Sequence, residues 1–281
     1  MIRIVEAIAI AFLLQGCSTI SQINLISTPD ELEMGRQFAG EVDREVDLIR
    51  DPQVVSYVDS LGQILAAHSR RSEIPYYFKV VNTDEVNAFA LPGGHLYVNR
   101  ALITTAENES ELAGVIAHEI GHVVGRHGAK QMTKQLGLSV LLGSISGQDP
   151  GLGRKVAAEV AGLGAGLTLL KYGREAEAEA DAFAVEETYA SGIDPMGTAS
   201  FFGKLLALHE KEPEAEGFAR LFQTHPPTSE RIDRVRSAVE GLPPQKDLMR
   251  DSKRFQRVKA YLLKKYPPKA KEKGAEKARE R

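Results

Sequence analysis

Two histidines and one glutamate are spaced in this chain as a metal site requires: His118-Glu119-Ile120-Gly121-His122. On a helix the histidines stand at i and i+4, so both imidazoles project from one face. That pair can hold one Zn²⁺ ion, with Glu119 beside it as general base for a water molecule. The alternative is an ordinary surface helix that carries two spaced histidines, and the flanking residues decide between the two.

The flanks predict a buried helix. Asn108 is placed as an N-cap and Glu111 as the third helical residue of a capping box. Apolar residues then recur at helical spacing: Leu112, Val115, Ile116, Ile120, Val123 and Val124. The two histidines would therefore lie in a largely apolar helix, where buried polar groups need partners. A metal ion is one such partner.

A hydrolytic zinc site has three protein ligands and one open position, so a third ligand is needed. His127 lies one residue before the position that a longer zinc-protease pattern requires, which is Gly128. A helix continuing through His127 would also turn it away from His122, and we expect a capping or surface histidine. The alternative is a carboxylate from the Ala/Glu-rich helix over residues 174–184. Glu177 and Asp181 share a face there, although composition alone favours a solvated acidic face.

Further segments extend the pattern: Glu177-Ala178-Glu179-Ala180-Asp181, Thr224-His225-Pro226-Pro227, Arg231, and the Asn87–Asn99 stretch ahead of the histidines. In their order along the chain, these segments and the His118–His122 motif resemble the zinc endopeptidase family (gluzincins) that includes HtpX, the CaaX prenyl protease and bacterial periplasmic lipoprotein proteases. The resemblance covers roughly residues 28–240. It implies three ligands for one Zn²⁺ per chain: His118, His122 and Glu177. It also implies that Glu119 is the general base.

The resemblance assigns supporting roles to three more residues. Asp181 would steady a ligand histidine from outside the metal shell. His225 would either stabilise the developing oxyanion or occupy the fourth zinc position in a resting, self-inhibited form. Arg231 would support the site or only join two helices.

The expected fold is α+β and mostly helical: a zincin-like metallopeptidase with a small antiparallel sheet beside the HExxH helix. Helices are expected from Thr28 to about Ile49 and again from Asp51-Pro52, with strands over residues 76–81, 89–91 and 95–98. We expect an exposed sheet edge that binds extended substrate, formed by His95, Leu96, Tyr97, Val98 and Asn99. The alternative is a purely structural hairpin.

The N-terminus is typical of a lipoprotein. Residues 4–14 are apolar apart from Glu6, too short a run to span a bilayer, and lead to Cys17, the single cysteine. We expect a signal peptide over residues 1–16, a lipid anchor on Cys17 and a tether over residues 17–27. The alternative is a stray thiol in an ordinary signal peptide. By analogy the protein would be periplasmic and anchored to the outer membrane of a Gram-negative cell.

Residues 135–148 and 156–170 are nearly uncharged and are expected to form a helical hairpin over the cleft, or a core helix pair. After a protease domain over residues 28–245, residues 246–281 are expected to form a basic helix and a disordered tail. Residues 252–281 hold 12 Lys and Arg against 3 Asp and Glu. With little aromatic interleaving, this tail does not indicate nucleic-acid binding. It would touch an anionic surface, bind the acidic body or have no specific partner.

We therefore predict an endopeptidase that cleaves polypeptides, namely unfolded or misassembled envelope proteins. One alternative is a zinc-stabilised chaperone or assembly factor with little proteolysis. A weaker one is an esterase or amidase that acts on cell-wall material with the same zinc chemistry. The sequence sets no oligomeric state.

Overall fold

The structure is a computed structural model that describes residues 24–134, 171–211 and 217–268. Three expectations therefore lie outside the described residues: the signal peptide with Cys17, the hairpin over residues 135–170, and the end of the basic tail. Within the described part of the chain, no helix has the length and apolar character needed to cross a membrane.

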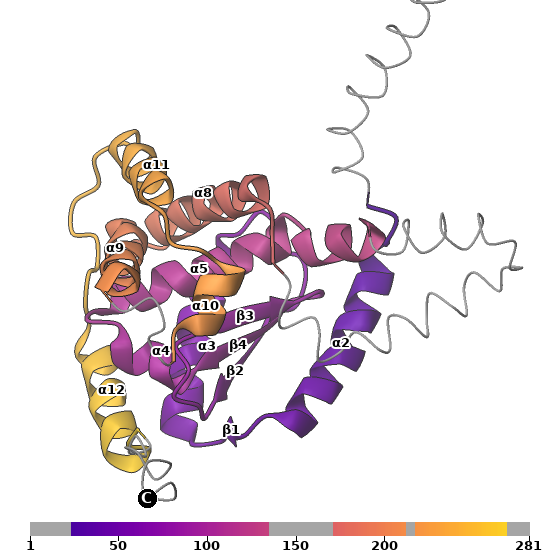
Figure 1. Cartoon of the computed structure of the whole chain (residues 1–281), viewed down its shortest axis with the longest axis horizontal. Helices are drawn as coiled ribbons and strands as arrows, with labels where there is room; N and C mark the ends of the chain where they lie inside the picture. The colour runs from indigo at the N-terminus through magenta and orange to yellow at the C-terminus, as the bar shows by residue number, and fades with distance from the viewer. Residues whose placement is uncertain (1–23, 135–170, 212–216, 269–281) are drawn as a thin grey trace, which may run out of the picture.

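Helices surround one four-stranded sheet (Figure 1). The strands are β1 (Leu48–Ile49), β2 (Tyr77–Val81), β3 (Ala88–Leu91) and β4 (His95–Asn99). The helices are α2 (Thr28–Glu45), α3 (Pro52–Ala67), α4 (Arg100–Thr105), α5 (Glu109–Val124), α8 (Arg174–Ala190), α9 (Met196–Lys211), α10 (Ala219–Thr224), α11 (Ser229–Glu240) and α12 (Lys253–Lys265). The mostly helical α+β class is confirmed.

The sheet is mixed, and the expectation of an antiparallel sheet is wrong in this respect. Its strand order is β1-β2-β4-β3, in which β1 pairs antiparallel with β2 and β3 pairs antiparallel with β4. The two central strands, β2 and β4, run parallel in the register Tyr77 to His95. The hairpin around Pro92-Gly93-Gly94 is present, but the chain must cross over before β4 can pair with β2.

The expected exposed edge at His95, Leu96, Tyr97, Val98 and Asn99 is also wrong. These five residues form β4, which has β2 on one side and β3 on the other, and all five are buried. Both rows of backbone groups are therefore occupied, and no peptide can add there as a strand. Among the described strands the sheet ends at β3, which lies beside α5 (Figure 1).

The first two helices begin close to where the sequence places them. Asp51 caps α3 as expected, since its side chain accepts the N–H of Gln53. Helix α2 begins at Thr28, and its cap is Ser27, whose side chain accepts the N–H of Asp30. Helix α2 ends at Glu45 rather than near Ile49, because Leu48 and Ile49 pair with β2 as strand β1.

Helix α5 lies between the sheet and the layer formed by α8, α9 and α11 (Figure 1). Every residue from Glu109 to Val123 is buried, so both its apolar and its polar side chains are enclosed. The predicted N-cap is confirmed: the Asn108 side chain accepts the N–H of Glu111 at 3.2 Å. The Glu111 carboxylate accepts the N–H of Glu107 at 2.8 Å, one residue before the N-cap that a capping box would use.

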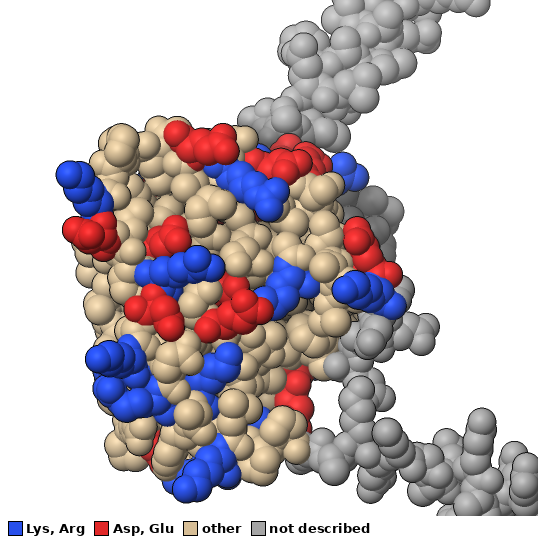
Figure 2. Space-filling view, turned by 90° about the vertical axis from the view of Figure 1, so that its left-hand side faces the viewer, with Lys and Arg blue, Asp and Glu red and all other residues tan. Residues whose placement is uncertain are grey.

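The predicted C-terminal helix is present as α12. Its apolar residues Phe255, Val258 and Leu262 are buried in the main core, while Leu263 remains 43% exposed. Lys and Arg gather on the lower part of the face in Figure 2, where α12 lies, while basic and acidic residues alternate above it. Helix α12 is thus a packed element of the domain with a basic outer face.

Candidate active site

The two motif histidines lie on one face of α5, and their Nε2 atoms point toward each other. Their spacing of four residues brings His118 Nε2 within 3.1 Å of His122 Nε2. The rings meet edge to face, with centroids 4.7 Å apart and an interplanar angle of 87°. Both side chains are almost fully buried, as is that of Glu119 between them. The helix therefore presents two imidazole nitrogens to one point.

Helix α8 supplies the carboxylate, and its close approach depends on Gly121. A Cβ at this position would lie 2.8 Å from the carbonyl oxygen of Ala180, so only glycine lets the two helices lie this close. At that separation Glu177 Oε1 lies 3.4 Å from His122 Nε2, and Oε2 lies 3.5 Å from His118 Nε2. The structure thus brings Glu177 to the position that the resemblance implies.

His225 joins the same cluster from the end of α10. Its Nδ1 lies 3.3 Å from His118 Nε2 and 3.1 Å from Glu177 Oε1. Its Nε2 points to the other side, 3.6 Å from Glu119 Oε1. The ring is buried, so it is part of the site and not of the surface.

These residues fit a zinc ion. One nitrogen or oxygen atom from each of His118, His122, Glu177 and His225 lies within 4.8 Å of the others. Four ligands arranged tetrahedrally at about 2.0–2.1 Å from Zn²⁺ would lie about 3.3–3.4 Å apart, close to the distances observed here. Three imidazoles and a carboxylate are also ligand types that zinc prefers.

Asp181 and Arg231 hold the site from outside. Asp181 Oδ1 lies 2.9 Å from His118 Nδ1, the ring nitrogen that faces away from the cluster. Arg231 donates to both oxygens of Asp181, at 2.9 and 2.7 Å, and its Nη1 lies 2.9 Å from Glu177 Oε2. Arg231 therefore does both things considered for it: it contacts the site and joins α11 to α8.

This packing sets the charge states of the metal-free site. Burial, the largest influence, lowers the pKa of His118, but Asp181 and Glu177 outweigh it and raise that pKa to about 9. Burial also raises the pKa of Asp181, but contacts with His118 and Arg231 reverse the effect and bring it to about 2. The pKa of Glu119 is raised, mainly by burial, which favours its protonated form.

Sequence reasoning missed three residues around His122. His127, expected to be a capping or surface histidine, is buried, and its Nδ1 lies 2.8 Å from His122 Nδ1. Glu179 lies 3.1 Å from the other nitrogen of His127. Tyr172 stacks on the His122 ring with centroids 4.2 Å apart. No local sequence pattern singles out Tyr172, and the position of His127 depends on a backbone turn described below.

Comparison with known proteins places the clustered residues within a known protein family. The model of peptidase family M48 matches residues 52–239, which include α5, α8 and His225. The chain belongs to peptidase family M48. This confirms the family that the resemblance indicated.

Several M48 relatives are named as proteases. The β-barrel assembly-enhancing protease of Escherichia coli (strain K12) is 32% identical over 248 residues, which cover 85% of this chain and 49% of the relative. Metalloprotease LoiP of the same strain is 27% identical over 250 residues, covering 84% of this chain and 95% of the relative. Mitochondrial metalloendopeptidase OMA1 of Schizosaccharomyces pombe is 28% identical over 181 residues, covering 64% and 51%. The chain thus spans about half the length of the first relative.

Proposed function

We propose that this M48 protein is a zinc-dependent endopeptidase. The observation that carries the proposal is the convergence of four buried ligand atoms, with Glu119 beside them. His118, His122 and Glu177 would hold one Zn²⁺ per chain. When bound, Zn²⁺ supplies Lewis acidity, which polarises a carbonyl oxygen and lowers the pKa of water toward about 7.

The chain's own residues divide the remaining work. Glu119 accepts the proton of the attacking water and later donates it to the leaving amine. Asp181 holds the ring of His118, so that its other nitrogen stays aimed at the cluster. His225 places a nitrogen in the same cluster, so it would be a fourth ligand in a resting form and would have to move aside to admit substrate.

Polypeptides of the cell envelope are the proposed substrates. The similarity to a protease named for enhancing β-barrel assembly supports this class, as does the lipoprotein-like N-terminus. We propose that the protein is exported to the periplasm and attached by lipid on Cys17, to the outer membrane of a Gram-negative cell. The substrates would be unfolded or misassembled chains.

One observation favours a second candidate, a zinc-stabilised chaperone or assembly factor. Structural zinc sites are closed by four protein ligands, and four are present here if His225 is counted. A structural site has no need of a general base, however, and Glu119 is buried within reach of the cluster. The position of Glu119 favours the protease.

The test uses the protein lacking residues 1–17, its Glu119→Gln variant and unfolded casein. Both should retain one zinc per chain, and the variant should lose about 10²–10⁴-fold in kcat because the proton acceptor is gone. Removing zinc with a chelator should abolish cleavage in the parent, and adding it back should restore it. Zinc in both proteins without cleavage in either would point to a latent enzyme or to the chaperone, which the His225→Ala variant separates. Absence of zinc in both would overturn the ligand assignment.

The His225→Ala variant tests the resting form in the same assay. If His225 closes the fourth position, its removal should speed casein cleavage while zinc is retained. A fall in kcat would instead assign His225 to the stabilisation of the oxyanion.

A further inference from the structure

His127 reaches the metal-binding region because the backbone turns sharply after α5. The helix ends at Val124, and Arg126 adopts a left-handed conformation with φ 53°. The Arg126 side chain is tied down by Glu31 Oε2 at 2.7 Å and by the carbonyl oxygen of Ile26 at 2.7 Å. The described chain is helical again over residues 127–134. This turn folds the ring of His127 back toward His122.

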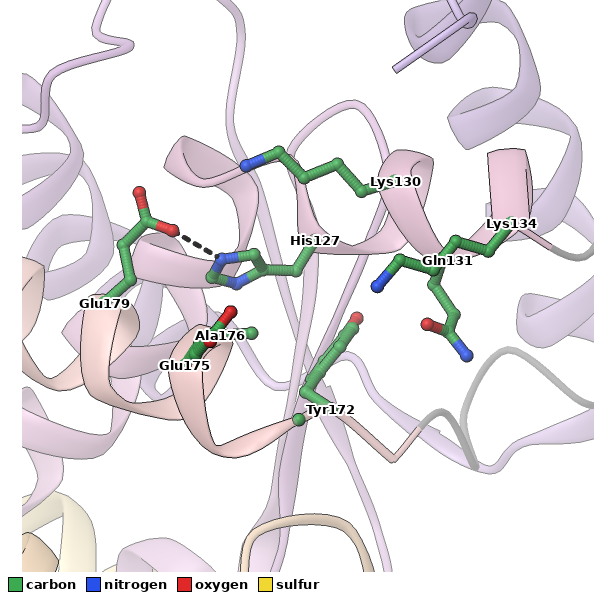
Figure 3. A pocket seen from close by; sticks show the side chains of 9 residues that line it. His127, Lys130, Gln131, Lys134, Tyr172, Glu175, Ala176 and Glu179 are labelled. Atoms are coloured by element: carbon green, nitrogen blue, oxygen red, sulfur yellow. Dashed lines mark hydrogen bonds and ion pairs between the residues drawn. The ribbon is translucent and has the colours of Figure 1, made fainter. Parts of the chain in front are cut away.

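His127 then lies between a candidate metal ligand and a carboxylate. Its Nδ1 is 2.8 Å from His122 Nδ1, and its Nε2 is 3.1 Å from Glu179 Oε2. The His127 ring is only 4% exposed, whereas the Glu179 side chain is 46% exposed. Figure 3 shows the contact between His127 and Glu179 among the residues that line an open recess. The row of contacts His122–His127–Glu179 thus runs from the centre of the site to solvent.

The positions of the ring nitrogens determine the direction of the two hydrogen bonds in this row. His122 Nε2 faces Glu177 and His118, so a ligand role leaves its proton on Nδ1. That N–H can donate only if His127 Nδ1 carries a lone pair. His127 then carries its own proton on Nε2, and this N–H donates a hydrogen bond to Glu179. All three groups are satisfied in one arrangement of protons.

We propose that His127, held by Glu179, positions His122 as a metal ligand. The proposal rests on the proposed function, because it assumes that His122 binds zinc through Nε2. His127 would then hold the Nδ1 side of His122, as Asp181 holds the Nδ1 side of His118. Ligand histidines bind metal more tightly when such a contact fixes their tautomer and orientation.

Gly125 supports a specific role for the His127 ring. Gly125 has φ −69°, a conformation open to any residue, so the backbone does not explain the glycine. A Cβ there would lie 2.6 Å from His127 Cε1 and would contact Nε2 even more closely. The absence of a side chain at position 125 is therefore what leaves room for the ring against His122.

A matched pair of variants separates hydrogen bonding from packing. Asn and Leu have similar shapes, but only Asn has an oxygen near the place of Nδ1 that can accept the His122 N–H. We expect His127→Leu to lower zinc affinity about 10–100-fold. His127→Asn should recover most of that loss. Gly125→Ala should behave like His127→Leu, since its methyl group displaces the ring, and it also serves if His127→Leu fails to fold.

Glu179→Ala and Glu175→Ala provide the second comparison. Both glutamates are exposed, stand on α8 and line the same recess, but only Glu179 is bonded to His127. Glu179→Ala should weaken zinc binding by less than about 10-fold, because solvent can replace an exposed carboxylate. Glu175→Ala should leave zinc affinity unchanged.

The measurements are zinc affinity by competition with a chromophoric chelator and the visible spectrum of the cobalt-substituted proteins. The thermal midpoint of each metal-free protein reports on folding. A lower zinc affinity and an altered spectrum in His127→Leu and Gly125→Ala, with recovery in His127→Asn, would support the proposal. Equal affinities in the Leu and Asn variants, or wild-type affinity in Gly125→Ala, would overturn it. If the wild-type protein binds no zinc, the proposed function fails first and this inference with it.

Discussion

The two motif histidines are supported in different ways on their outer sides. His118 faces Asp181, which is buried and held by two hydrogen bonds from Arg231. His122 faces His127, whose far side meets the half-exposed Glu179. One support is sealed between α8 and α11, while the other ends at an open recess (Figure 3). The first support is therefore part of what holds the helices together, and the second is a local contact that can vary without unfolding the domain.

The largest difference should appear when Arg231 is replaced. Arg231→Met would leave Asp181 and Glu177 buried without their common cation, and breaking such a buried pair costs about 3–5 kcal/mol. We expect the free energy of unfolding of the metal-free protein to fall by about this amount in urea denaturation.

Arg234 on the same helix provides the control, since its ion pair with Glu230 is exposed. Arg234→Met should change the free energy of unfolding by less than about 1 kcal/mol. Similar losses in the two variants would mean that the sealed support of His118 has no special role in stability.

This comparison also shows how far sequence reasoning reaches. Local rules predicted the cap at Asn108 and the shared face of His118 and His122, because both depend only on neighbouring residues. The place of His225 was implied by family resemblance alone, since no spacing rule connects it to a histidine 107 residues earlier. Without the resemblance, the part of the site that local rules could predict was therefore the part encoded within one helix.

The missed features have non-local causes. His127 turns inward because Arg126 adopts a left-handed conformation, tied to a glutamate 95 residues away in sequence. The mistaken edge at His95–Asn99 arose because β4 pairs with β2 in parallel, and a hairpin pattern does not reveal a second neighbour. In both cases a contact between distant segments set a feature that the local sequence pattern does not reveal.

The next expected effect concerns metal binding on the His118 side. Asp181→Ala should lower zinc affinity toward the upper end of the usual 10–100-fold range, because a buried contact cannot be replaced by water. The matched change on the other side, Glu179→Ala, should cost less. Chelator competition measures both, and a larger loss for Glu179→Ala would reverse the assignment of sealed and open supports.

The smallest expected effect on stability concerns Glu187, a third buried carboxylate of α8. It provides a contrast with Asp181 because no partner is described for it. Neither of its carboxylate oxygens is bonded within the described part of the chain, and burial raises its pKa well above 4.5. Asp181 has the opposite shift, to a pKa of about 2, because it has an arginine and a histidine beside it. Asp181 and Glu187 are both buried, so the charged partners of Asp181 decide whether the carboxyl pKa rises or falls on this helix.

The two carboxylates should therefore give opposite pH dependences of stability in the metal-free protein. The contribution of Asp181 is present above its unfolded pKa of 3.8 and is lost as pH falls through about 2. Glu187 stabilises least at high pH, because above pH 4.5 the unfolded chain releases a proton that the folded chain keeps. Glu187→Gln should raise the free energy of unfolding more at pH 8 than at pH 5, a difference that thermal melts at the two pH values would detect. Glu175→Gln, an exposed change on the same helix, should show no such pH-dependent gain. If Glu187→Gln shows none either, Glu187 has found a partner in solution and the contrast with Asp181 fails.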